Sequence, residues 1–326
     1  MTDEDQGQPD PICALHGADL ESIRKFLVVA DELHFGRAAR RLGIAQPPLS
    51  RAVRQLERRL GATLLERGSG PVTLTAAGQV LAGEGKVALA AVAAAVRRTQ
   101  RAARPGPRLV LAMKPGGDGN LLPGILAAYE RTPGAIPVQV VCSFGERAAM
   151  LRDGRADVAL LYGPRENLTG FAIEELLTED QVVVLPQGHR LAGRAAVSLA
   201  DLRGQTMPRW PHLPADGADG PEVHDTGQLM QLIALGQVVA VLPESVRGLL
   251  RHDLVCVPVT DAPATTLLLA WPEAATSLAL AAFVRAATET AAGAAYAGAD
   301  ASDRVARNAS RASWMFSTEF AYENRM

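Results

Sequence analysis

Basic and amide side chains share one face of a short segment between residues 46 and 58. Leu49, Val53, Leu56 and Leu60 recur there at helical spacing, which predicts a helix with one buried stripe. Arginine can pair with a guanine edge and glutamine with an adenine edge through two hydrogen bonds each. An ordinary amphipathic helix with a solvated charged face is the alternative interpretation. The side chains left on the open face, and therefore predicted to contact bases, are Gln46, Pro47, Ser50, Arg51, Arg54, Gln55 and Arg58.

Residues before this segment and at its start predict the elements that would hold it in place. Ala38 and Ala39 let another helix cross closely, and Gly43 suits the positive φ at which helices commonly end. Pro47 and Pro48 fit a first helical turn, where no backbone N–H needs a partner within the helix. The pattern indicates a helix-turn-helix with Ile44 filling its corner and His34 packed between helices. Asp19 is expected to cap an earlier helix that ends near Glu32 and buries Leu20, Ile23, Phe26, Leu27 and Ala30.

Two strand-like stretches follow, Leu64–Arg67 and Val72–Thr75, separated by a Gly68-Ser69-Gly70-Pro71 turn, and Ala76-Ala77-Gly78 then opens a long helix. This order of elements resembles the N-terminal domain of LysR-type transcriptional regulators. The resemblance is close from Leu20 to Arg104 and looser to Ala292. It implies a winged helix-turn-helix that binds double-stranded promoter DNA, with Arg67 of the wing meeting phosphate or the minor groove.

The long helix is Ala-rich and runs without proline from Ala76 to about Ala103, a length of about 40 Å at 1.5 Å per residue. Its own small domain is too small to cover the apolar residues along it. In the family, the same helix of a second subunit covers them, which implies a homodimer that further assembles into a homotetramer. The resemblance leaves contact with RNA polymerase open.

Beyond a Pro105-Gly106-Pro107 hinge, strand-like and helical stretches alternate up to residue 292, which favours parallel sheets covered by helices. The segments 152–160 and 236–244 resemble the family's two-lobed α/β effector domain, which is similar to type 2 periplasmic binding proteins. Val238 stands where the family tends to have a second glycine. Strands are expected at 108–113, 138–143, 158–162, 181–186, 206–210, 238–242, 254–259 and 265–271, and helices at 121–131, 146–152, 227–235, 244–251 and 277–290.

The fold class is therefore a multidomain chain that combines α+β and α/β parts. We expect a disordered extension at 1–17, a winged helix-turn-helix at 18–75, a linker and dimerisation helix at 76–104, and an effector-binding domain at 108–292. Lobe I of that domain takes 108–162 and 265–292, lobe II takes 163–264, and the tail 293–326 is either disordered or a docking segment.

Ligands of open α/β sheets bind beyond the carboxyl ends of the strands. Lys114–Asn120 follows the first predicted strand, and Cys142-Ser143-Phe144 follows the second. A lysine with glycine N–H groups suits a carboxylate, so the sequence predicts a small organic anion as effector; a mobile surface loop is the alternative. By resemblance, Ser143 falls where family members often place a Ser or Thr that contacts effector. The candidate effector-binding residues are Lys114, Gly116, Ser143, Phe144, Trp210 and Thr226.

Charge separates the N-terminal part from the rest. Residues 18–104 hold 15 Lys and Arg against 7 Asp and Glu, although the whole chain of 326 residues carries −2. A basic module joined to an acidic body fits DNA binding coupled to a sensory domain. No apolar stretch approaches the ~20 residues of a membrane span, since charges interrupt each one, and a cytoplasmic location is expected.

Three scattered cysteines and six dispersed histidines lack metal-ligand spacing, and no catalytic constellation stands out, so neither cofactor, metal nor enzymatic activity is expected. Cys142 is interpreted as a small core residue, with a redox sensor as the alternative. A solute-binding protein and an enzyme on the two-lobed fold remain alternative functions.

Overall fold

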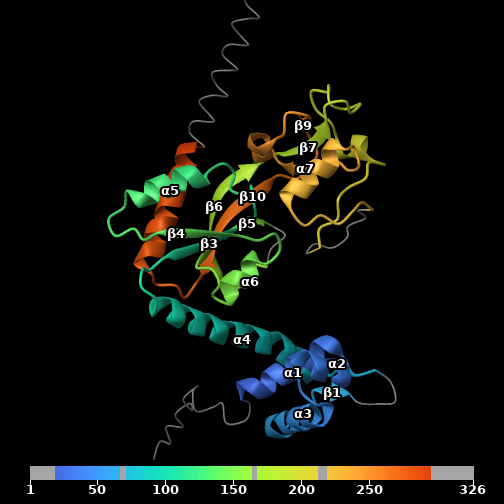
Figure 1. Ribbon diagram of the computed structural model, residues 1–326, viewed down its shortest axis with the longest axis vertical. Helices are drawn as coiled ribbons and strands as arrows, with labels where there is room; N and C mark the ends of the chain where they lie inside the picture. The colour runs from blue at the N-terminus through green and yellow to red at the C-terminus, as the bar shows by residue number, and fades with distance from the viewer. Residues whose placement is uncertain (1–18, 67–70, 164–166, 212–218, 295–326) are drawn as a thin grey trace, which may run out of the picture. The chain divides into compact units, whose positions relative to one another are not determined.

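The computed structural model describes residues 19–66, 71–163, 167–211 and 219–294 (Figure 1). The expectations for 1–17 and for nearly all of the tail 293–326 lie outside these residues. The chain divides into two compact units, residues 1–100 with 152–154 and residues 101–151 with 155–326. Each unit is considered by itself below.

The first unit begins with three helices, α1 (Leu20–Glu32), α2 (Phe35–Leu42) and α3 (Gln46–Leu60). The predicted signals at their ends are confirmed. The Asp19 carboxylate accepts a hydrogen bond from Ser22 N at 2.6 Å, Gly43 ends α2 with φ of 67°, and prolines occupy the first turn of α3. The helices enclose a core that includes Ile23, Phe26, Leu27, Val29, Ala38, Ala39, Leu49, Val53 and Leu56.

Several predicted positions in this unit are wrong. Leu60, the last residue of α3, is 41% exposed because the helix ends at Gly61 beyond the core. Leu20 and Ile44 are also exposed, whereas Val29 is fully buried in α1. His34 is exposed at the start of α2, where its Nδ1 accepts hydrogen bonds from Gly36 N and Arg37 N at 3.0 and 3.2 Å, so it caps the helix.

The wing strands β1 (Leu65–Glu66) and β2 (Thr73–Leu74) pair antiparallel and lead into α4 (Ala76–Ala102). The Thr75 hydroxyl donates to Thr63 O at 2.7 Å and accepts from Gly78 N at 3.0 Å, which joins the wing to the start of α4. Gly78 is required because a Cβ there would lie 2.0 Å from Leu64 O. Residues 67–70 of the predicted wing turn, including Arg67, lie outside the described residues.

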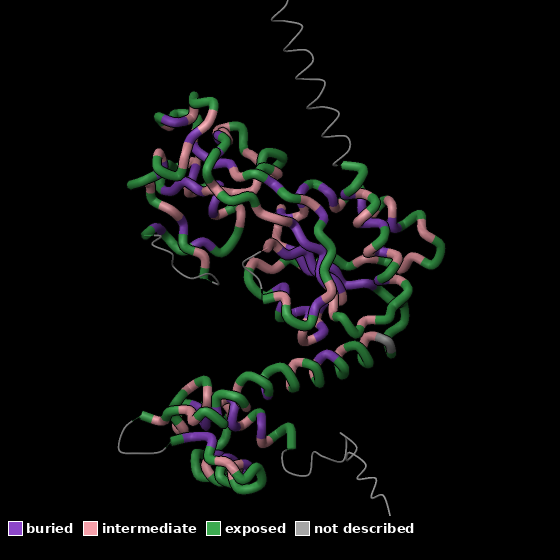
Figure 2. Tube along the Cα trace, turned by 180° about the vertical axis from the view of Figure 1, so that it is seen from behind, coloured by how far each residue is buried: buried purple, intermediate pink, exposed green. Residues whose placement is uncertain are grey.

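Most residues of helix α4 are exposed or only partly buried, as Figure 2 shows, and several of the exposed ones are apolar. Leu81 and Leu89 pack on the helical core of the first unit, but the small domain does not cover the helix, in agreement with the sequence. By length and composition alone, Ala76–Arg101 is also apolar enough to cross a membrane, although the charges of Glu84 and Lys86 interrupt it, as expected from the sequence. The exposed valines are Val80, Val87, Val92 and Val96.

The second unit contains a five-stranded sheet in the order β4-β3-β5-β10-β6. Successive residues of the inner strand β3 point to opposite faces of the sheet. Leu111 packs with α5 and with the helix formed by residues 278–294, while Val110 packs with α6. The elements are β3 (Leu109–Met113), α5 (Leu122–Glu130), β4 (Val138–Cys142), α6 (Arg147–Arg152), β5 (Val158–Gly163), β6 (Phe171–Glu179) and β10 (Thr265–Pro272).

A three-stranded sheet, β8-β7-β9, forms the second lobe, and all its pairs are antiparallel. One face packs against α7, and the other packs against the segment around Leu191, Val197 and Leu202. The elements are β7 (Gln181–Pro186), the 3-10 helix η2 (Leu199–Leu202), α7 (Thr226–Ala234), β8 (Ala240–Pro243), the 3-10 helix η3 (Glu244–Leu249) and β9 (Leu254–Pro258).

The topology adds antiparallel strands to the parallel arrangement that the sequence favoured, and it moves the predicted lobe boundary. Strand β3 is parallel to β4 and β5, but β10 runs antiparallel between β5 and β6. The reason is that the chain passes between the lobes twice. It leaves the first lobe where β6 leads directly into β7, and it re-enters the first lobe as β10. Residues 171–179, predicted for lobe II, therefore belong to the sheet of lobe I.

Two predicted elements of lobe II also differ. Residues 206–210 make an isolated bridge at Arg209 instead of a strand, and Pro208 has no N–H to donate to a ladder. Residues 244–249 form a 3-10 helix instead of an α-helix. Val238 is buried, and Gly236 before it has φ of 68°.

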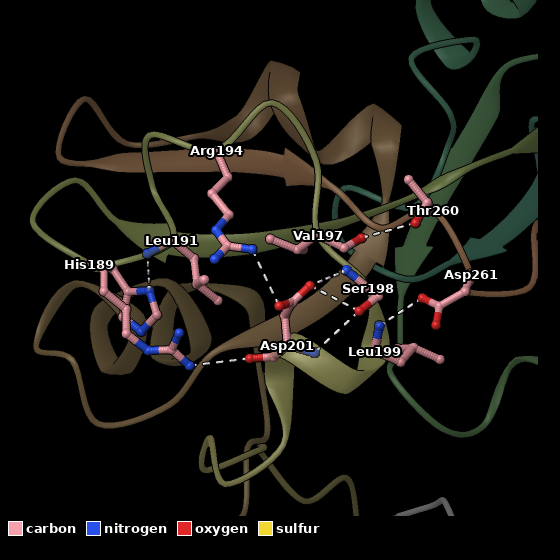
Figure 3. A network of polar contacts seen from close by, with 10 residues as sticks. His189, Leu191, Arg194, Val197, Ser198, Leu199, Asp201, Thr260 and Asp261 are labelled. Atoms are coloured by element: carbon pink, nitrogen blue, oxygen red, sulfur yellow. Dashed lines mark hydrogen bonds and ion pairs between the residues drawn. The ribbon is translucent and has the colours of Figure 1, made fainter.

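A polar network fixes the outer side of lobe II (Figure 3). Ser198 and Asp201 cap η2 reciprocally: the Asp201 carboxylate accepts from Ser198 N at 2.9 Å, and the Ser198 hydroxyl accepts from Asp201 N at 3.3 Å. Leu199 N donates to the Asp261 carboxylate at 2.7 Å, which joins η2 to the segment after β9. The hydrogen bonds from Ser198, with the nearby Arg194 and Arg190 charges, lower the pKa of Asp201.

Candidate functional site

The outer face of α3 presents three guanidinium groups to solvent. Arg51, Arg54 and Arg58 are exposed, and within the described residues none of them makes a hydrogen bond or ion pair. Gln46, Pro47 and Gln55 are exposed as well, and Ser50 is half-buried. The structure thus brings the seven predicted α3 residues onto one helix with most of them accessible.

The opposite side of α3 fixes its orientation. Leu49, Val53 and Leu56 are fully buried. Glu57 Oε1 accepts hydrogen bonds from Leu64 N and Leu65 N at 3.0 and 3.2 Å, so the helix also positions the first wing strand. The sequence reasoning missed this role of Glu57, although an acidic residue at the end of a basic helix was the available signal.

Two of the three arginines of α2 are partly neutralised by acidic neighbours, whereas those on the outer face of α3 make no ion pair within the described residues. Arg37 Nε lies 3.2 Å from Glu32, and Arg41 Nη1 lies 3.3 Å from Glu32 and 3.6 Å from Asp31. A helix with a buried apolar stripe and an exposed basic face matches the size and charge of the DNA major groove.

A second candidate site is a small cavity between the two lobes of the second unit, about 40 Å³ in volume. It lies beyond the carboxyl ends of β3, β4 and β5, where α/β sheets hold ligands. Five of the six predicted effector residues line it: Lys114, Gly116, Phe144, Trp210 and Thr226.

Ser143, the sixth, is not among the lining residues. Its hydroxyl accepts a hydrogen bond from Glu146 N at 3.2 Å before α6, which is a capping role. Its neighbour Cys142 is exposed at the end of the edge strand β4, so the interpretation of Cys142 as a core residue was wrong.

Direct contacts join the lobes across the cavity. Phe144 and Trp210 stack with ring centroids 5.9 Å apart and planes 14° apart. The Thr226 hydroxyl donates to Pro115 O at 3.3 Å, and Asn120 Nδ2 donates to Ser245 O at 3.3 Å. The sequence could not reveal Asn120 or Ser245, since their pairing joins residues far apart in the chain.

The cavity lining includes the cation of Lys114 and the phenol of Tyr162, and a buried carboxylate, that of Glu179, lies nearby. Lys114 Nζ lies 4.6 Å from the ring centroid of Tyr162, a cation–π contact. Partial burial, and then the negative charge of Glu179, raise the pKa of Tyr162, so its phenol stays neutral at physiological pH. Glu179 is buried, and its Oε1 accepts from Ser245 N at 2.8 Å. Tyr162 was missed, although its place at a strand end was the same signal that indicated Lys114.

Neither site offers a metal-binding cluster. Over the described residues, no three His, Cys, Asp or Glu side chains gather closely enough to hold a metal ion.

Known families match both units. The helix-turn-helix model described as "Bacterial regulatory helix-turn-helix protein, lysR family" matches residues 20–79, and "LysR substrate binding domain" matches residues 102–292. These matches place α3 in the DNA-binding element and the cavity in the substrate-binding domain.

Two curated relatives and one solved structure agree. AlsR of Bacillus subtilis, an HTH-type transcriptional regulator, is 32% identical over 206 residues, covering 61% of this chain and 68% of that protein. IlvR of Caulobacter vibrioides is 31% identical over 272 residues, covering 78% of this chain and 92% of that protein. The crystal structure of CbnR shares the fold with a TM-score of 0.52 and 23% identity, covering 84% of this chain and 99% of that one. The chain belongs to the LysR family of DNA-binding transcriptional regulators, which join a helix-turn-helix to an effector-binding domain.

Proposed function

We propose that the chain reads promoter DNA with the exposed face of α3 and that a small organic anion in the inter-lobe cavity modulates this binding. The observation that carries the proposal is the set of exposed guanidiniums on α3, which have no partner among the described residues. Arg51 and Arg54 are the base-reading candidates, with Gln46, Pro47, Ser50, Gln55 and Arg58 beside them. Arg67 of the wing is proposed for phosphate on sequence grounds alone.

Lys114 is the proposed anchor of the anion, because a single cation in a mostly apolar cavity suits one negative charge. Gly116, Phe144, Trp210 and Thr226 are proposed to surround the ligand, and Ser143 to act indirectly through the loop that carries Phe144.

Self-association through α4 is part of the proposal. Four exposed valines on one helix leave apolar surface that a second copy of α4 would cover. A dimer presents two copies of α3, and a tetramer presents four. The regulator is proposed to act in the cytoplasm, where promoter DNA is, and to have no enzymatic activity.

DNA binding is tested by fluorescence anisotropy, with a duplex from the region upstream of the gene and a shuffled duplex of equal length. The full-length protein should prefer the upstream duplex, and Arg54→Ala should lower that affinity about 10-fold or more, since a bidentate base contact contributes about 1–3 kcal/mol. Arg59→Ala is the matched control, because Arg59 lies on the same helix as Arg54 but pairs with Asp19, the N-cap of α1, at 3.2 Å. Equal affinity for both duplexes, or equal effects of the two substitutions, would contradict the proposal.

A further inference from the structure

The cavity between the lobes carries two parallel aromatic faces, one from each lobe. Phe144 follows β4 in the first lobe, and Trp210 lies in the second. Both side chains are half-buried and line the cavity with Lys114. Their planes differ by 14°, so the two faces present flat, opposed surfaces.

Hydrogen bonds hold the backbone beneath each ring. The buried Arg147 guanidinium donates from Nη1 to Ser143 O and Phe144 O at 3.2 and 3.0 Å. In the other lobe, Arg209 N donates to Pro221 O at 3.0 Å, and Val223 N donates to Arg209 O at 2.8 Å, next to Trp210. The spacing of the rings therefore depends on the separation of the lobes more than on either loop.

The cavity is too small for an organic ligand while the rings touch. Its 40 Å³ accommodates only a few water molecules, whereas small-molecule sites measure about 300–1,000 Å³. A ligand must therefore separate the lobes. A flat ring between Phe144 and Trp210 would need planes about 7 Å apart, at about 3.5 Å for each contact, and would replace one stacking contact by two.

The rest of the lining fits a ligand with one negative charge. Among the described residues that line the cavity, Lys114 is the only one with a charged side chain. Leu229, Met230 and Leu242 are apolar. A carboxylate beside Lys114 would be attached to an otherwise apolar group.

We infer that the effector is a planar aromatic carboxylate whose ring inserts between Phe144 and Trp210 and whose carboxylate lies beside Lys114. The inference rests on the proposed function of the cavity as an anion site and adds the requirement for a flat ring.

The test measures binding to the full-length protein by calorimetry and tryptophan fluorescence. The probes are benzoate, cinnamate and 1-naphthoate, with cyclohexanecarboxylate as the saturated ring and hexanoate as the open chain. At least one aromatic probe should bind 10-fold more tightly than both aliphatic ones. It should also change the fluorescence of the double variant Trp271→Phe and Trp314→Phe, in which Trp210 is the one tryptophan left, and leave that of Trp210→Phe unchanged.

The substitution Phe144→Leu keeps an apolar side chain and removes one flat face, so it should abolish the preference for aromatic probes. The selectivity of the unmodified protein decides the matter without any variant, should Phe144→Leu fail to fold. Equal or tighter binding of the aliphatic carboxylates would overturn the ring insertion and leave the anion site intact. Absence of binding for every carboxylate at millimolar concentration would overturn both the ring insertion and the anion site. The DNA anisotropy assay tests the role of α3 separately.

Discussion

The polar side chains of α3, the helix proposed to read DNA, and those of the inter-lobe cavity differ in whether they already have partners. On α3, Arg51 and Arg54 extend into solvent without a partner among the described residues. At the cavity, Thr226 and Asn120 already donate hydrogen bonds to the opposite lobe. The first surface is open to a ligand, and the second is occupied by its own lobes.

This difference predicts different contributions to the binding free energy at α3 and at the cavity. A duplex that bound α3 as proposed would displace no contacts of Arg51 or Arg54 among the described residues, so its affinity would depend mainly on charge and on hydrogen bonds between side chains and base edges. An effector that bound in the cavity as proposed would first have to break contacts between the lobes, and the strength of these contacts would reduce its net affinity. A ligand that favours the separated lobes shifts the population toward them by the difference in its affinity for the two states.

The largest expected effect comes from Gly78→Ala, which tests whether the open DNA surface depends on a rigid frame. A Cβ at Gly78 would lie 2.0 Å from the backbone oxygen of Leu64, which has little freedom to move. Overpacking usually costs 1–3 kcal/mol, and a clash with backbone should reach about 3 kcal/mol. Hydrogen exchange should rise in α1, α2 and α3, specific DNA binding should fall, and peptides of residues 171–186 should exchange as before.

Gly83→Ala is the matched control on the same helix. No atom lies within 4 Å of the Cβ that it adds, and alanine favours the helix over glycine by about 0.5–1 kcal/mol. This variant should therefore be as stable as the original or slightly more so. Similar loss of protection in both variants would show that packing at Gly78 is not the cause.

The sequence predicted the helix-turn-helix well because its signals are local. Asp19 caps the next turn, Gly43 ends the helix that precedes it, and Leu49 and Val53 repeat at helical spacing. Each of these signals acts within a few residues. Errors occurred at positions such as Leu60, where burial depends on how far the core extends.

The cavity was predicted only in part because its other contacts join distant residues. Lys114 and Phe144 follow strands, so the rule for strand ends indicated them. Glu179 reaches Ser245 N only because the chain continues from β6 into β7, which pairs with β8 just before Ser245. No local pattern encodes that crossing. The return of residues 265–292 to lobe I was predicted only through the family resemblance, and the antiparallel direction of β10 was not predicted.

Glu179→Ala tests the contacts that keep the lobes together. Without the carboxylate, Ser245 N loses its acceptor in a partly buried place, which costs about 1–3 kcal/mol. Exchange should increase in η3 and β8, and the melting temperature should fall. Glu175→Ala is the control, since Glu175 is exposed on the same strand. Equal hydrogen exchange in the two variants would mean that Glu179 does not help to hold the lobes together.

Thr226→Val sharpens the comparison with a smaller change. It replaces the hydroxyl that donates to Pro115 O by a methyl group of similar size and removes about 0.5–1.5 kcal/mol of contact between the lobes. Because a ligand must separate the lobes, the variant should bind the carboxylate probes about 2- to 10-fold more tightly by calorimetry. Thr288→Val removes a hydroxyl contact within the helix of residues 278–294 and should leave affinity unchanged. Weaker binding by Thr226→Val would instead assign the hydroxyl to the ligand.

The smallest expected effect concerns Asp201, whose network lies on the outer side of lobe II. Hydrogen bonds from Ser198 lower the pKa of Asp201, so the ionised carboxylate stabilises the folded state at neutral pH. This contribution is lost as the pH falls through the lowered pKa, below the usual value of about 3.9. Asp201→Ala should therefore lower the melting temperature at pH 7, and its melting temperature should differ less from that of the original chain at pH 3.

Asp201→Asn is the control, because it keeps an oxygen that accepts from Ser198 N. It should lower the melting temperature by less, and by nearly the same amount at both pH values. Effector affinity should not change in either variant, because Asp201 lies outside the cavity lining; a change there would mean that the outer network also controls the separation of the lobes.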